Sequence, residues 1–313
     1  MEIREAVNKD IPEILKVLKA SLGETSSKKT EEVWRFKHVD NPFGRSLVLL
    51  AEEGGEVVGV RAFMRWKWQE GNQVFSAFRA VDTATHPNYQ GKGIFKKLTK
   101  KALEVAANNG DHFVFNTPNK QSKPGYLKMG WEEVGKLNVG VFPVNPFYWS
   151  KKENIEKYGV VWNDEIKLDF FDNWNEKLEK TGKLFTPKSE SYLNWRYVNN
   201  PLQKYKVFFN NGFFIAGYVK KHTYFKELRI SEVILSSDYN KKSLKKKVKN
   251  WTKELGVNLV SFNIPGGESL NFYSFTGKFG PILTFKGIDE NLDDSYFLNN
   301  ENWEYSLGDL ELF

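Results

Sequence analysis

Two glycines, Gly91 and Gly93, stand in a short polar segment whose neighbours could make it a phosphate-binding loop. The run before them, residues 75–85, alternates apolar and polar side chains and predicts a strand, and the basic amphipathic run 95–109 after them predicts a helix. Glycine lets backbone N–H groups approach an anion, and a helix N-terminus adds the positive end of its dipole. The predicted loop consists of Gln90, Gly91, Lys92, Gly93, Ile94 and Phe95.

A second group of polar side chains shares one face of a short helix. Asn119, Ser122 and Tyr126 follow one another at spacings of three and four residues, and the helix predicted over residues 122–129 stops at Gly130. This shared face makes Tyr126 a candidate functional residue, and the alternative is that its ring only packs between helix and sheet.

One carboxylate lies in the strand that leads to the glycine loop. Asp82 stands between Val81 and Thr83, and an acid in a buried strand is costly unless it is paired or functional. It could deprotonate an amine directly or through water, or it could make a structural hydrogen bond to a neighbouring loop. His86 has the ordinary pKa of a base, but its position before Pro87 favours contact with a cofactor or with solvent.

Composition excludes several kinds of chemistry. The 313-residue chain has no cysteine, which excludes disulfides, thiolate nucleophiles and cysteine metal sites. Its histidines show no His-x-x-x-His spacing, so we expect no metal. The N-terminus is charged, and no apolar run is long enough to span a membrane. These features predict a cytoplasmic protein without a membrane partner.

The net charge is +7, and its densest contribution is six lysines among residues 241–249. A run of this kind is typical of a solvated helix face. Nucleic-acid binding would need aromatic or arginine side chains interleaved with the lysines, and this run has none. We therefore expect no nucleic-acid partner.

Periodicity predicts an α/β layer arrangement around a central mixed sheet. The expected order over the first 144 residues is β-α-α-β-β-β-α-β-α-β. Besides the elements already named, strands are predicted at residues 2–7, 46–52, 56–65 and 112–116 and from residue 131, and helices from residue 11 and over residues 30–39.

The second half of the chain repeats landmarks of the first. Val-Asp-Asn-Pro at residues 39–42 corresponds to Val-Asn-Asn-Pro at 198–201, and Phe-Asn-Thr-Pro at 115–118 corresponds to Phe-Asn-Ile-Pro at 262–265. Tyr126 and Gly130 would then match Tyr273 and Gly277. The order of these landmarks predicts an internal duplication.

The duplication predicts two domains, residues 1–144 and 164–313, joined by a packed connector at residues 145–163. The second copy has no glycine between residues 218 and 255, where its own phosphate loop would lie. Without glycine the backbone cannot easily enclose a pyrophosphate. The second domain is therefore expected to be a degenerate copy without a phosphate site of its own, which helps to form the site of the second substrate, the acceptor.

Residues 90–94 resemble the pyrophosphate loop of the GNAT superfamily of acyl-CoA-dependent N-acyltransferases, whose loop usually ends in Gly or Ala where this chain has Phe95. Residues 119–131 and the order of elements are also similar to that family. The resemblance implies two tandem GNAT-like domains, each a mixed, mostly antiparallel sheet flanked by helices, with acyl-CoA as co-substrate. It further implies that Tyr126 protonates the leaving thiolate and that Asn119 contacts the pantetheine arm. Backbone groups of Thr83, Ala84 and Thr85 would pair with pantetheine amides and hold the thioester carbonyl.

Acyl transfer from a thioester to an amine needs positioning, an oxyanion donor and protonation of the thiolate, but no covalent enzyme intermediate. That suits a chain without cysteine and without a Gly-x-Ser-x-Gly motif. Aromatic and basic side chains that could bind the acceptor are His38, Trp195, Arg196 and Tyr197. An ordinary amphipathic helix with its apolar face inward explains His38 and its neighbours equally well.

The resemblance implies a small-molecule amine as the acceptor, and the expected amine is the amino group of a nucleotide-linked sugar. Two alternatives remain: an aminoacyl or peptide transferase of the cell-wall-bridge type, and a non-enzymatic acyl-CoA-binding protein. A duplicated chain already contains the interface that single-domain relatives obtain by dimerising, so a monomer is expected.

Overall fold

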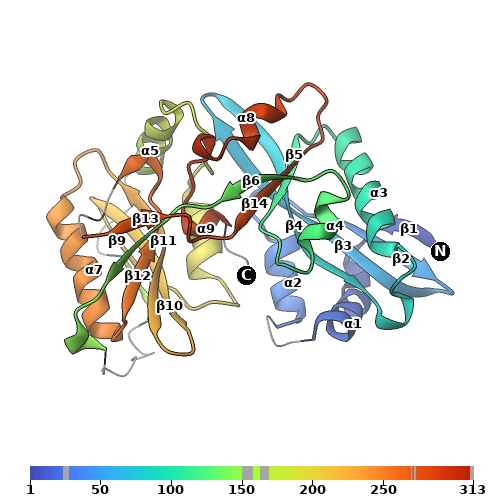
Figure 1. Ribbon diagram of the computed structural model, residues 1–313, viewed down its shortest axis with the longest axis horizontal. Helices are drawn as coiled ribbons and strands as arrows, with labels where there is room; N and C mark the ends of the chain where they lie inside the picture. Colours follow the sequence, from blue (N-terminus) through green and yellow to red (C-terminus); the bar gives the residue numbers. More distant parts are fainter. Residues whose placement is uncertain (24–27, 150–157, 163–168, 269, 271–272, 311–313) are drawn as a thin grey trace.

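The computed structural model describes the chain except residues 24–27, 150–157, 163–168, 269, 271–272 and 311–313. Its described part forms two mixed seven-stranded sheets side by side, each flanked by helices (Figure 1). The prediction of an α/β fold with two related sheets is therefore confirmed.

The first sheet has the order β1-β2-β3-β4-β5-β14-β6. Its strands are β1 (Glu2–Glu5), β2 (Leu47–Glu53), β3 (Glu56–Glu70), β4 (Gln73–Thr85), β5 (Phe113–Asn116), β14 (Ile282–Gly287) and β6 (Glu132–Lys136). All pairs of adjacent strands in this sheet are antiparallel, except that β4 and β5 are parallel.

Alternation along β2 explains why helices cover both faces of this sheet. Leu47, Leu49 and Ala51 pack with the apolar stripe of α3 (Ile94–Asn108), whereas Val48 and Leu50 pack with α1 (Ile11–Leu22). Side chains two residues apart in a strand point to the same face, so one strand can supply both cores. The remaining helices of this half are α2 (Glu31–His38) and the short α4 (Lys123–Leu127).

The second sheet has the order β8-β9-β10-β11-β12-β7-β13, which repeats the strand order of the first, except that its edge strand β8 runs parallel to β9 whereas β1 and β2 are antiparallel. Its strands are β8 (Val160–Trp162), β9 (Lys206–Asn210), β10 (Phe213–Lys221), β11 (Lys226–Leu235), β12 (Leu259–Phe262), β7 (Val139–Pro143) and β13 (Phe275–Gly277). The helices of the second half are α5 (Phe170–Glu179), α6 (Glu190–Leu193), which continues into a π-helix (Asn194–Val198), and α7 (Lys241–Leu255). Two short helices, α8 (Asp294–Leu298) and α9 (Leu307–Leu310), follow near the end of the described chain.

The Asn-Pro landmarks behave alike in the two halves. The Asn41 side-chain oxygen accepts from Phe43 N at 2.9 Å, and that of Asn200 accepts from Leu202 N at 2.9 Å. The later landmark does not correspond: Tyr126 is buried, but Tyr273 is 99% exposed. The match of Tyr126 with Tyr273 was therefore wrong, because the residues after β12 form no counterpart of α4 in the part that the structure describes.

The two halves exchange one strand each. β7 leaves the first half and pairs with β12 and β13, while β14 returns from the second half to lie between β5 and β6. The predicted domain boundary at residue 144 therefore divides the sequence into two halves, but each half contributes a strand to the sheet of the other. The predicted connector also contains β8 of the second sheet, although residues 150–157 and 163 lie outside the described part.

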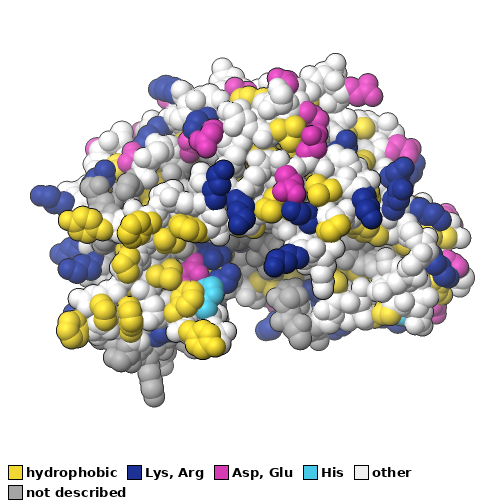
Figure 2. Space-filling model, in the orientation of Figure 1, with side chains coloured by type: hydrophobic (Ala, Val, Ile, Leu, Met, Phe, Trp, Pro, Cys, Tyr) yellow, Lys and Arg dark blue, Asp and Glu magenta, His cyan; other side chains and the backbone are white. Residues whose placement is uncertain are grey.

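At the far edge of the second sheet, β13 and the residues after it expose large apolar side chains. Phe275 is 69% exposed and Phe279 63%, and Figure 2 shows hydrophobic side chains gathered over this part of the molecule. Among the described helices, none is both long and apolar enough to cross a membrane.

Candidate active site

A cavity of about 1230 Å³ opens where the predicted site elements meet. It is lined by the loop before α3, the C-terminal ends of β4 and β5, α4 and the turn before it, and residues of α1, of α2 and of the segment between them. All of its lining residues come from the first half of the chain. Lining residues from the predicted set are Asp82, Thr83, Ala84, Thr85, Gln90, Gly91, Gly93, Ile94, Phe95, Asn119 and Tyr126.

The glycine loop has the backbone that its sequence requires. Gly91 and Gly93 adopt φ of 78° and 73°, and Gly93 is the N-cap of α3. A Cβ added to either glycine would meet no atom within 4 Å, so both Cα positions face open space. Lys92 is the one predicted loop residue outside the lining. Its ammonium lies 3.8 Å from Glu53 and 4.6 Å from the centre of the Tyr89 ring.

A β-bulge in β4 faces the same cavity. Arg61 pairs with Thr83 and Ala62 with Val81, so Asp82 is an extra residue on β4, and its φ is 38°. A bulge leaves the extra residue outside the ladder and re-aims the strand. Backbone groups at residues 82–85 thus border the cavity near the end of the pairing between β4 and β5, which stops at Arg79 and Phe115.

Asp82 is an ion-paired carboxylate. Its Oδ2 accepts from the Lys37 ammonium and lies 3.0 Å from His38 Nε2, while the other ring nitrogen of His38 lies 2.9 Å from Ser46 Oγ. Burial alone would raise the pKa of Asp82, but the Lys37 charge and the His38 hydrogen bond outweigh it and hold that pKa well below its ordinary value. Burial lowers the pKa of His38, so this histidine is neutral.

These partners correct the prediction that Asp82 is a general base. A carboxylate with so low a pKa binds a proton too weakly to take one from an ammonium group efficiently near neutral pH. Lys37 lines the cavity beside Asp82, but it was not identified from the sequence as a site residue. Its position one helical turn after Val33 and Trp34, on the apolar side of a helix, was the available signal.

Tyr126 lies under the cavity with its ring buried among Phe95 and Trp131. Its phenolic oxygen accepts a hydrogen bond of 2.8 Å from the Arg61 guanidinium. Asn119 is exposed at the start of the same turn, and its side-chain oxygen accepts from the N–H groups of Gln121 and Ser122. The side chain of Asn119, which was expected to contact the pantetheine arm, thus closes the turn that precedes α4.

The predicted acceptor residues lie elsewhere. Trp195 stacks on Phe36 and donates to its carbonyl oxygen at 2.8 Å, Arg196 donates to Gly308 O, and Tyr197 donates to Glu232. All three are buried, as is His38, and none of the four lines the cavity. His86 also lies outside the lining and accepts from Asn88 N at 3.4 Å.

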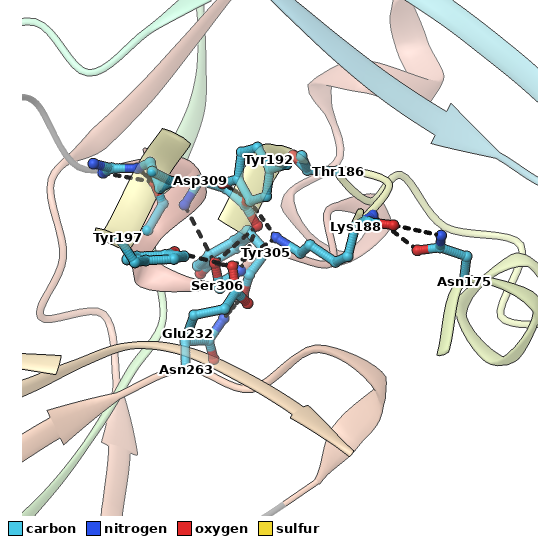
Figure 3. Close-up of polar contacts among 12 residues, drawn as sticks. Asn175, Thr186, Lys188, Tyr192, Tyr197, Glu232, Asn263, Tyr305, Ser306 and Asp309 are labelled. Carbon is cyan, nitrogen blue, oxygen red and sulfur yellow. Dashed lines mark hydrogen bonds and ion pairs between the residues drawn. The ribbon is translucent and has the colours of Figure 1, made fainter. Parts of the chain in front are cut away.

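In the second half, the chain's own C-terminal segment fills the region beside β11 and β12. Lys188 bridges Glu232 and Asp309 at 2.8 and 2.7 Å, and Asn263 donates to Tyr305 O at 2.6 Å (Figure 3). Burial raises the pKa of Glu232 to about 7. α7 starts at Asn240, whose side chain caps the first turn, and no glycine is present there.

Comparison with known proteins agrees with this geometry. Residues 2–134 match a family model described as an acetyltransferase (GNAT) domain. No curated protein matches the chain.

Similar solved structures extend over both halves. A GCN5-related N-acetyltransferase from Anabaena variabilis has a TM-score of 0.62 at 13% identity, and a probable N-acyltransferase of unknown function from Enterococcus faecalis has 0.64 at 10%. Each alignment covers 92% of this chain and 73% of the other. Eis1 from Mycobacterium abscessus has a TM-score of 0.55 at 12% identity, covering 92% of this chain and 74% of its own. At such identities the likeness concerns the fold. Residues 2–134, less than half of the chain, therefore form a GNAT acetyltransferase domain.

Proposed function

We propose that this enzyme transfers an acyl group from acyl-CoA to a primary amine by direct attack, without a covalent enzyme intermediate. One observation carries the proposal: a single cavity joins the glycine loop, the β4 bulge and Tyr126. Those three features supply an anion site, backbone groups for the thioester and a proton donor, which are the groups that transfer from an acyl-CoA requires.

In this proposal the pyrophosphate of CoA lies against Gly91 and Gly93 at the N-terminus of α3, and the pantetheine arm lies along residues 82–85. The amine nitrogen attacks the thioester carbon, and a backbone N–H at the bulge stabilises the oxyanion. The C–S bond then breaks, and Tyr126 gives its proton to the departing sulfur. The nitrogen loses its proton to water in the cavity, and water reprotonates Tyr126.

Asp82 has a different part in this scheme from the one expected. Its Oδ2 accepts from Lys37 and His38, and no described residue bonds to its Oδ1. Its side chain is 13% exposed and borders the cavity. We assign Asp82 to binding the amine as a hydrogen-bond acceptor, with Lys37 keeping the carboxylate charged.

A nucleotide-linked amino sugar was expected because of aromatic and basic residues in the second half, and those side chains are buried. The intact glycine loop favours acyl-CoA over the aminoacyl donors of cell-wall-bridge enzymes.

A thiol-release assay tests the proposal with several acyl-CoAs against nucleotide amino sugars, amino acids and peptides. Tyr126→Phe should lower kcat about 100-fold while leaving CoA affinity within about twofold. Tyr296→Phe is the matched control, because Tyr296 donates to Gly182 O far from the cavity lining and its loss should not change the rate. No release with any amine would overturn the transferase, and release with amino acids or peptides alone would overturn the amino-sugar acceptor.

A further inference from the structure

Arg61 is an unusual buried cation. It lies on β3 with none of its surface exposed, and its Nη1 donates to Tyr126 Oη at 2.8 Å and to Thr83 Oγ1 at 2.5 Å. Within the described residues, its Nε and Nη2 have no hydrogen-bond partner, and no carboxylate lies within ion-pair distance. Burying a charge without a counterion costs free energy.

Other arginines in the chain are better paired. The buried Arg79 donates to backbone oxygens of Asp309 and Leu310, and the partly exposed Arg65 forms an ion pair with Asp111. Arg61 instead meets three aromatic rings, with its guanidinium carbon 4.6 Å from the centre of Phe63, 5.2 Å from Tyr126 and 5.5 Å from Phe95. Cation–π attraction offsets part of the desolvation cost and leaves the guanidinium in a dry site.

The bond between Arg61 and Tyr126 can run in only one direction. A guanidinium has donors and no acceptor, so the phenolic oxygen must accept. The O–H of Tyr126 is thus not used by Arg61, and no described side chain accepts it. Because Tyr126 lines the cavity, its proton is free to point to a ligand there.

The same contact also favours the charge that proton donation creates. When Tyr126 gives up its proton, the phenolate oxygen stays 2.8 Å from a permanent cation that water does not screen. A hydrogen bond to a charged oxygen in a dry site is stronger than one to a neutral oxygen. Arg61 touches no cavity space itself, so any effect on the reaction must act through its partners.

Phe95 completes this arrangement and explains the bulky residue at the end of the glycine loop. Its ring meets the Tyr126 ring edge-on, with centres 5.9 Å apart, and packs so closely on Gly125 that an added Cβ would lie 3.3 Å from it. A glycine or alanine at position 95 would leave this space open to water.

We propose that Arg61 is a positioning residue for Tyr126, turning the phenol into an obligatory donor and stabilising the phenolate, and that Phe95 keeps the pair dry. The inference rests on the proposed function, in which Tyr126 protonates the leaving thiolate. The tested variants are Arg61→Met, Arg61→Lys and Phe95→Ala, with Arg65→Met as the matched loss of an arginine from the same strand.

The measurements are kcat for thiol release, the dissociation constant for CoA, and the midpoint of thermal unfolding. Arg61→Met should lower kcat at least 10-fold with CoA affinity within about twofold, and Arg61→Lys should recover part of the loss because it keeps a cation. Arg65→Met should leave kcat unchanged. Phe95→Ala should slow thiol release in the same direction as Arg61→Met.

A double-variant cycle separates positioning from mere structural support. If Arg61 acts through Tyr126, Arg61→Met should change kcat less than twofold in a Tyr126→Phe background. Equal losses in both backgrounds would overturn the inference alone. An unchanged kcat in Tyr126→Phe would overturn the acid assignment, and absence of release by the unaltered enzyme would overturn both proposals. Should Arg61→Met fail to fold, the cycle is run with Arg61→Lys.

Discussion

At the residue scale, two charged side chains in neighbouring buried strands define the chemistry of this site. Asp82 was recognised from the sequence because an acid in an apolar strand is conspicuous, and Arg61 offered the same signal on β3. Their partners could not be recognised. Lys37, His38 and Tyr126 lie 45, 44 and 65 residues away in sequence from the groups that they bond. Because of those partners, we interpret Asp82 as an ion-paired carboxylate and not as a general base.

The ion pair of Asp82 and Lys37 predicts unequal effects on stability and activity. Asp82→Asn should cost about 3 kcal/mol in unfolding free energy, because it leaves a buried ammonium without its counterion. Adding Lys37→Met should restore most of that stability while leaving amine turnover low. Urea unfolding and acceptor kinetics on the same samples check both parts. Full activity in Asp82→Asn would remove this residue from the acceptor site.

Glu232 predicts a pH dependence of stability. Its pKa is raised to about 7 from an ordinary 4.5, so the folded chain holds a proton that the unfolded chain releases between those values. The free energy of unfolding should therefore fall by about 3 kcal/mol from this group as pH rises from about 4.5 to 7. Glu232→Gln, which cannot titrate, should lack this contribution. Equal pH slopes for the two proteins between pH 5 and 8 would contradict the shift.

At the scale of elements, the site is built where regular structure is interrupted. The loop before α3 needs two left-handed glycines, and β4 needs a bulge to bring residues 82–85 to the cavity. α7 shows the contrast, because an asparagine cap starts a helix of the same length without making a phosphate loop. The N-cap residue is thus the local difference between the two helices: glycine precedes α3, whose N-terminus borders the cavity, and asparagine precedes α7.

This difference predicts the effect of one added methyl group. Gly93→Ala should strain a φ of 73° by about 1 kcal/mol and place a Cβ in open cavity space. Gly110→Ala is a matched control, because Gly110 has φ of 75° and equally open surroundings at the other end of α3. Both should lower the thermal midpoint slightly, but only Gly93→Ala should weaken CoA binding, by at least 10-fold. Calorimetric titration with CoA distinguishes the two, and equal affinities would place the pyrophosphate elsewhere.

At the scale of the whole molecule, the exchanged strands make the two halves one folding unit. β6 depends on β14 for its place in the first sheet, and β7 lies between β12 and β13 in the second. Arg79 on β4 adds bonds to the backbone of residues 309 and 310. The cavity belongs to the first half, so the second half supports the site through shared strands more than through lining side chains.

Fragments of the chain test this dependence. Residues 1–144 and 145–313 should each be insoluble or unfolded when produced alone, because each lacks a strand from the interior of its own sheet. Produced together, they should copurify through a tag on either one. Leu283→Asp, which puts a charge at a fully buried position of β14, should abolish copurification. A folded, soluble 1–144 fragment would contradict the prediction.

The sequence by itself determined the features that depend on local chemistry: the glycine loop, the helix after it, the strands with alternating burial, Tyr126 in its short helix, and the repeated Asn-Pro landmarks. These follow from backbone freedom and hydrophobic period, which neighbouring residues decide. Only the tertiary structure decided the strand exchange, the pairing of Asp82 with Lys37, the contact between Arg61 and Tyr126, and the burial of Trp195, Arg196 and Tyr197. Each of these contacts joins residues far apart in sequence. An apolar pattern predicts that a side chain is buried, but it does not predict which residues that side chain contacts.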